Sequence, residues 1–193
     1  MQKRTFLLKT SAALAFACLS LTACTTTSGS GKADASAVRS EIDGGYDSTL
    51  NRLYAQVKGS RELVAKADGV LIFPRVIAAG LVVGGEYGKG ALRTKGPTES
   101  YYSVGSVSVG LQAGAQSKAI VILFMNHEVL QKFRDSKGWT AGADASVAVL
   151  KVGANGEIDT ANAGNPVQAL VLTNAGLMAN LTLEGTKVSH LDL

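Results

Sequence analysis

Residues 118–125 read KAIVILFM, a run that is apolar from Ala119 to its end. β-Branched and aromatic side chains favour strands, and a strand without a polar face has to be covered on both sides. The run therefore predicts a central strand buried between two layers, which the rest of the chain has to supply.

The residues before this strand predict helices. From Ala35 to Val57, apolar side chains recur every three or four positions, which is the period of one helix face. Gly44-Gly45 interrupts the pattern and predicts a kink or a break into two helices. A second, short helix is expected over residues 60–67.

Most of the remaining sequence predicts strands, separated by turn residues. A slip in the apolar phase near Gly105 predicts a β-bulge there. A short helix capped by Asn126 is also expected. The expected strands are 70–73, 79–86, 88–94, 99–113, 118–125, 139–141, 146–152, 167–173, 177–183 and 187–191.

Helices that precede a long run of strands predict an α+β fold with an antiparallel sheet. Glycine is dense from Gly80 to Gly114, which is typical of strands that bend sharply or pack closely. We therefore expect N-terminal helices packed on a glycine-rich, bulged antiparallel β-sheet that closes into a barrel.

The N-terminal residues predict a bacterial lipoprotein signal. Three basic residues precede a short apolar run at 12–21, and small residues lead to Cys24. The thiol of Cys24 is the side chain at that point that can carry a thioether-linked diacylglycerol. We expect residues 1–23 to be removed as a signal peptide and acyl chains such as palmitate on Cys24 to anchor the protein.

The predicted organisation after cleavage is a lipidated, flexible tether over 24–34 and one domain over 35–193. Thr25 resembles the residue at this position in lipoproteins sorted to the outer membrane, so the domain is expected in the periplasm. Loss of three basic residues with the signal leaves 16 basic against 15 acidic residues, a net charge of +1. That balance gives no support to nucleic-acid binding.

Motifs for catalysis are not found in the sequence. His127 and His190 are its two histidines, and no His, Asp or Glu pair has the spacing of metal ligands. No serine lies in a Gly-x-Ser-x-Gly elbow. Residues 84–90 lack the spacing of a phosphate-binding loop and are interpreted as a tight turn between two strands. We therefore expect no enzymatic activity and no cofactor.

Three cations, Lys89, Arg93 and Lys95, fall within seven residues that hold no acid. Such a group is compatible with a solvated strand edge that resists strand addition. It is also compatible with contact to anionic lipid headgroups, and Lys89, Arg93 and Lys95 are our candidate headgroup-binding residues. The next candidates are Lys58, Arg61, Lys66 and Arg75.

Four ordered blocks carry a family resemblance: VLIFP at 70–74, GLVVGGEYGKG at 80–90, GLQAGAQ at 110–116, and FR at 133–134 followed by GW at 138–139. Over residues 35–191 the chain resembles a SYLF domain, also called the Ysc84 actin-binding domain. The resemblance implies binding of acidic lipids or phosphoinositides and, in fungi, of actin. The predicted first helix carries both acids and bases, so it differs from the cationic membrane helix of eukaryotic relatives.

The expected function is that of a membrane-anchored periplasmic lipoprotein with a non-enzymatic lipid-binding module. The alternative is an envelope structural or protein-interaction lipoprotein, with actin as a partner only where the protein meets a host cell. A hydrolase with an unrecognised site is the remaining rival.

Overall fold

The computed structural model describes residues 31–80, 83–109, 114–152, 156–158, 164–173, 176–177 and 183–193. Residues Lys32–Leu193 form one compact unit. The predicted signal peptide and the predicted lipidation site at Cys24 lie outside the described residues. The helices are α1 (Gly31–Gln56), α2 (Ser60–Lys66) and α3 (His127–Asp135). The strands are β1 (Gly69–Gly80), β2 (Val83–Arg93), β3 (Thr98–Val109), β4 (Gly114–Phe124), β5 (Trp139–Thr140), β6 (Val147–Val149), β7 (Val167–Thr173), β8 (Gly176–Leu177) and β9 (Lys187–His190).

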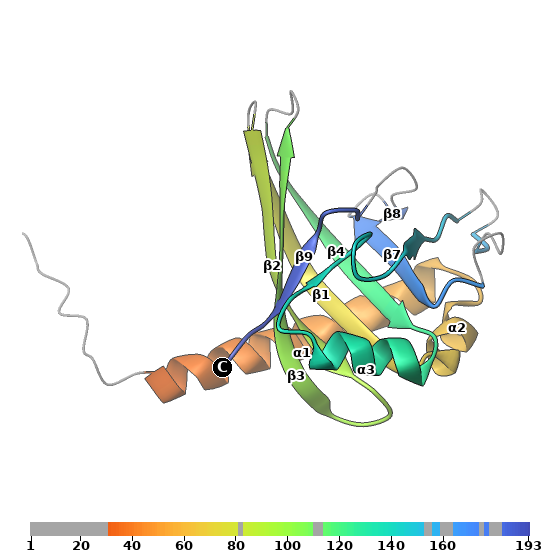
Figure 1. Cartoon of the computed structure of the whole chain (residues 1–193), viewed down its shortest axis with the longest axis horizontal. Helices are drawn as coiled ribbons and strands as arrows, with labels where there is room; N and C mark the ends of the chain where they lie inside the picture. The colour runs from red at the N-terminus through yellow and green to blue at the C-terminus, as the bar shows by residue number, and fades with distance from the viewer. Residues whose placement is uncertain are drawn as a thin grey trace, which may run out of the picture. The chain divides into compact units, whose positions relative to one another are not determined.

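These strands form one sheet in the order β5-β9-β3-β2-β1-β4-β7-β6, with β8 beside β7. The predicted α+β class, with N-terminal helices on a curved sheet, is confirmed (Figure 1). The sheet is a half-barrel rather than the closed barrel expected, because its path ends at β5 and β6 and no pairing joins these two among the described residues. It is also mixed, since β6 pairs with β7 in parallel.

Two hydrophobic clusters cover the two faces of the sheet, as the apolar run at 118–125 required. On one face, α1 and α2 pack against buried residues of β1, β4 and β7, among them Ile72, Val121 and Leu123. On the other face, α3 packs its buried Leu130 and Phe133. In Figure 1, α1 accordingly passes behind the sheet while α3 lies in front of it.

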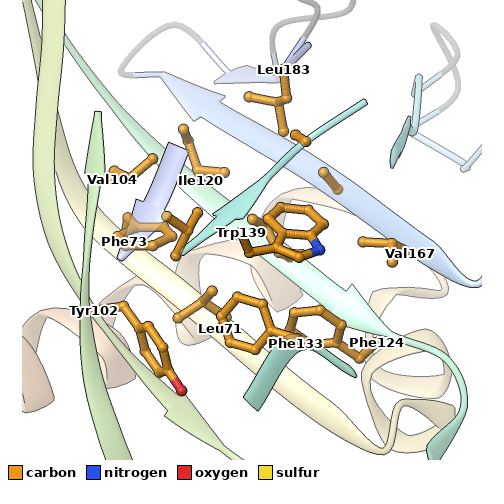
Figure 2. Packing of buried hydrophobic residues seen from close by; sticks show 14 of the residues in the cluster. Leu71, Phe73, Tyr102, Val104, Ile120, Phe124, Phe133, Trp139, Val167 and Leu183 are labelled. Atoms are coloured by element: carbon orange, nitrogen blue, oxygen red, sulfur yellow. The ribbon is translucent and has the colours of Figure 1, made fainter. Parts of the chain in front are cut away.

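Aromatic rings fill the α3 side of the sheet. Phe133 lies 4.7 Å from Phe124, 4.9 Å from Tyr102 and 5.7 Å from Trp139, measured between ring centroids. Figure 2 shows Trp139 lying over the two phenylalanines. At 3% exposure, Trp139 is a core residue, as it was interpreted from the sequence.

The start of the sheet differs from the prediction in its turns. β1 continues through Pro74, where the pairing register shifts, up to Gly80. Residues 84–90 therefore lie inside β2 and do not form the predicted turn. The expected bulge at Gly105 is also wrong, since β2 and β3 stay in register from 83/109 to 92/100 and shift only at Arg93. The phase slip arises because Val107 faces outward, 81% exposed, instead of into the core.

Helix α1 is continuous through Gly44-Gly45, so the predicted break into two helices is wrong. Gly45 lets the helix approach β1 closely, because a Cβ at this position would lie 2.8 Å from Cβ and Cγ of Pro74. The helix begins at Gly31, four residues earlier than the expected domain start. The predicted cap of α3 is confirmed, because the Asn126 side chain accepts a hydrogen bond from the backbone N–H of Val129 at 3.0 Å.

Candidate functional site

A groove of about 480 Å³ lies between α1 and the outer face of β1 and β2. Helical spacing places one side of α1 along it, because residues three and four apart share a face. Two strands supply the other wall, where Ile77 pairs with Tyr87 and Arg75 pairs with Lys89 in the ladder. The lining residues are Val38, Glu41, Ile42, Gly45, Ser48, Thr49, Arg52, Pro74, Arg75, Ile77, Tyr87, Gly88 and Lys89.

Three cations border this groove: Arg52 from α1, Arg75 from β1 and Lys89 from β2. Among the described residues, none of the three has an ion pair with a carboxylate. The Nε of Arg52 is buried and has no hydrogen-bond partner within that part of the chain. The groove therefore offers positive charge that no ion pair within the described ranges neutralises.

Apolar side chains lie beside these cations. Ile77 is 44% exposed and Tyr87 is 54% exposed, and both line the groove. Val107 of β3 is exposed near them, since its pairing partner Gly85 is two residues from Tyr87. The outer face of β1–β3 thus joins a cationic groove to an exposed apolar row formed by Ile77, Tyr87 and Val107.

Arg93 has a different role, at the far end of the same sheet face. Its guanidinium donates to Asp43 at 3.2 Å and to Asp47 at 2.5 Å, and it stacks 4.1 Å from the ring centroid of Tyr46. We call Arg93, Asp43, Asp47 and Tyr46 the Arg93 cluster. Because three of its members belong to α1, the cluster fastens the helix to β2.

Asp43 is the centre of the Arg93 cluster. It also accepts hydrogen bonds from the Thr98 hydroxyl at 2.5 Å and the Tyr101 hydroxyl at 2.9 Å. Partial burial raises the pKa of Asp43, but these hydrogen bonds and the charge of Arg93 outweigh it, so the pKa lies below its ordinary value. The carboxylate is therefore held ionised by its neighbours.

The structure separates the three predicted headgroup-binding residues. Lys89 lines the groove, Arg93 belongs to the Arg93 cluster with its side chain 20% exposed, and Lys95 is exposed in the turn after β2. Of the further candidates, Arg75 lies in the groove. Sequence reasoning missed Arg52 as a site residue. Arg52 follows Thr49 by three residues and Gly45 by seven, a spacing that places all three on the helix face that lines the groove.

The opposite face of the sheet carries a partly buried ion pair. Lys118 of β4 donates to Glu86 of β2 at 2.7 Å, across the intervening β1, and is 8% exposed. The two charges of this pair neutralise each other. Within the described ranges, no group of His, Cys, Asp and Glu could hold a metal ion, and no helix is long and apolar enough to cross a membrane.

The fold is an α+β half-barrel, and its outer face carries the groove described above. Residues 105–192, a little less than half of the chain, match the family model "Ysc84: Las17-binding protein actin regulator". This confirms the resemblance predicted from the sequence blocks, and the family is one of binding domains.

A curated relative extends the similarity. The chain is 26% identical over 129 residues to "SH3 domain-containing YSC84-like protein 1" of Xenopus laevis. The alignment covers 64% of this chain and 38% of the relative, so the chain spans well under half of that protein's length.

Proposed function

We propose that this protein is a non-enzymatic module that binds anionic lipid surfaces and is held at the outer membrane by acyl chains on Cys24, with its domain in the periplasm. The observation that carries the lipid-binding part is the juxtaposition on one sheet face of unpaired cations with exposed apolar side chains. Cations attract anionic headgroups, and an amphipathic aromatic such as Tyr87 favours the boundary between apolar and polar layers.

The charge distribution of the domain favours this face over a diffuse basic surface. The mature chain has a net charge near zero, so long-range attraction to a membrane is weak. Binding therefore depends on the local group of Arg52, Arg75 and Lys89, together with the exposed Lys95 on the same hairpin as Lys89.

Changing both Lys89 and Lys95 to Gln is expected to weaken binding to anionic vesicles strongly, by roughly 2 kcal/mol, because each near-surface cation contributes about 1 kcal/mol. The measurement is vesicle sedimentation at low and high salt, since screening should weaken the wild-type interaction. Arg93 stays unchanged in this variant, because its loss would also break the Arg93 cluster.

The matched control is Lys137→Gln. Lys137 is an exposed cation just before β5, on a segment that packs on the α3 side of the sheet. It should sediment like the wild type. Equal sedimentation of the double variant and the wild type would move the site elsewhere, and a wild type that ignores every anionic vesicle would favour the protein-interaction function instead.

The proposed anchor has its own test. Cys24→Ser should abolish incorporation of an alkyne-labelled fatty acid and leave an unprocessed or soluble protein, because a hydroxyl cannot form the thioether. Cys18→Ser, within the predicted signal, should label normally. Equal labelling of the Cys24 variant and the wild type would exclude acylation at this residue.

A further inference from the structure

We propose that the groove between α1, β1 and β2 binds one phosphate monoester through Arg52, Arg75 and Lys89. The inference rests on the proposed function and deepens it, because it replaces a charged surface with a defined site and names the chemistry of the headgroup. A lipid headgroup and a free phosphate ester both carry this chemistry.

The first step is the buried Nε of Arg52. This donor belongs to a permanently charged group, is closed off from solvent and has no partner among the described residues. The guanidinium of Arg52 also has no ion pair among the described residues, and an anionic oxygen in the adjoining groove would offset its charge. The groove that Arg52 lines is the space from which that oxygen would come.

The second step is the pairing of two like charges. Arg75 and Lys89 stand directly opposite each other in the β1–β2 ladder. Like charges at opposite positions repel, so this arrangement opposes folding while the groove is empty. A phosphate between the two side chains would attract both cations and so replace their mutual repulsion. The planar guanidinium of Arg75 is suited to contact two phosphate oxygens at once.

The third step is the number of charges. The groove is lined by three cations and one carboxylate, Glu41, which leaves two net positive charges. A phosphate monoester carries about −1.5 to −2 at neutral pH, whereas a phosphodiester carries one negative charge. Charge matching therefore selects the monoester.

The fourth step concerns what carries the phosphate. Val38, Ile42 and Ile77 line the same groove beside the cations. A volume of about 480 Å³ lies within the range of pockets that bury small ligands, roughly 300–1,000 Å³. A lipid headgroup with the start of its acyl chains would use both kinds of lining, and a free phosphate ester would use only the polar kind.

The experiment is a calorimetric titration of the full chain with three soluble probes. These are glycerol 3-phosphate, short-chain phosphatidic acid below its micellar concentration, and short-chain phosphatidylglycerol, whose phosphate is a diester. Phosphatidic acid should bind at least tenfold more tightly than phosphatidylglycerol. Arg52→Gln and Lys89→Gln should each weaken the monoester about tenfold, the effect of one charge-assisted hydrogen bond. Lys137→Gln should change nothing.

The comparison of the two monoesters identifies the source. Much tighter binding of phosphatidic acid than of glycerol 3-phosphate indicates a lipid headgroup, and equal binding indicates a free phosphate ester. A diester that binds as well as the monoester would overturn the inference. Unchanged binding of the monoester by both the Arg52 and Lys89 variants would also overturn the inference. If Arg52→Gln disturbs folding, Arg75→Gln replaces it, because Arg75 is exposed.

Vesicle sedimentation separates this inference from the proposed function. Binding to all anionic vesicles alike, with no preference for phosphatidic acid, would refute the defined site and leave the proposed surface binding intact. Tight binding of glycerol 3-phosphate without any vesicle binding would support the site and refute the membrane function.

Discussion

Gly90→Ala is expected to destabilise the domain by about 3 kcal/mol, at the upper end of the cost of overpacking. Gly90 is buried in β2, where a Cβ would collide with the backbone carbonyl of Ile72 and lie 2.5 Å from Cδ1 of Phe73. The neighbouring strand cannot withdraw easily, because β1 changes register beside this position and pairs with β4 on its other edge. The added methyl group therefore strains backbone rather than a flexible side chain.

Chemical denaturation followed by circular dichroism measures this effect. In thermal unfolding, the same loss of about 3 kcal/mol should lower the melting temperature by roughly 6–12 °C in a domain of this size. Gly96→Ala is the matched control, because a Cβ at Gly96 meets no atom within 4 Å. It should change stability by less than about 0.5 kcal/mol. Identical midpoints for the two variants would show that β1 relaxes away from Gly90.

The parts of the fold that follow from periodicity could be predicted from the sequence. The helical repeat of α1, the cap of α3 at Asn126 and the strand Val167–Thr173 depend on local patterns, and the structure has them. The two-sided burial of the run at 118–125 followed from its lack of any polar face, and it fixed the layered α+β arrangement.

The turns could not be predicted, because the strongest local signals point the wrong way. Pro74 and the glycines of 84–90 are turn formers in isolation, yet both lie inside long strands. Pro74 is tolerated at a register shift, where the ladder is already interrupted. Gly88 and Gly90 are required by the close approach of β1, a tertiary contact that no local pattern encodes.

The candidate site was predicted only in part for a similar reason. Lys89, Arg93 and Lys95 are neighbours in sequence, but alternation and the approach of α1 give them three different surroundings. Arg93 is neutralised by aspartates 46 and 50 residues away. Arg52, 37 residues from Lys89 in sequence, joins it because the helix and the strand pack together. Charge clusters in sequence and in space therefore differ.

The Arg93 cluster leads to the second large effect, in which Arg93→Glu destabilises the domain by about 3 kcal/mol or more. The substitution removes two charge-assisted hydrogen bonds that Arg93 donates, one to the partly exposed Asp43 and one to the exposed Asp47. Here the new carboxylate also faces Asp43 and Asp47 and loses the stacking on Tyr46. Equilibrium unfolding in urea measures the loss. The control is Lys132→Glu in the exposed pair with Glu128, which should change the stability far less than Arg93→Glu, because solvent screens this pair.

The pH dependence of stability distinguishes the Arg93 cluster from simple packing. The pKa of Asp43 is lowered in the folded protein, so the folded state binds fewer protons at this site than the unfolded chain. The stabilisation is complete above the unfolded value of about 4 and is lost as pH falls through the lower, folded pKa. Asp43→Asn should therefore be less stable than the wild type at pH 7 and lose less stability below pH 4. Parallel pH profiles for the two proteins would mean that Arg93 and Asp43 hold α1 by shape alone and that their charges contribute nothing.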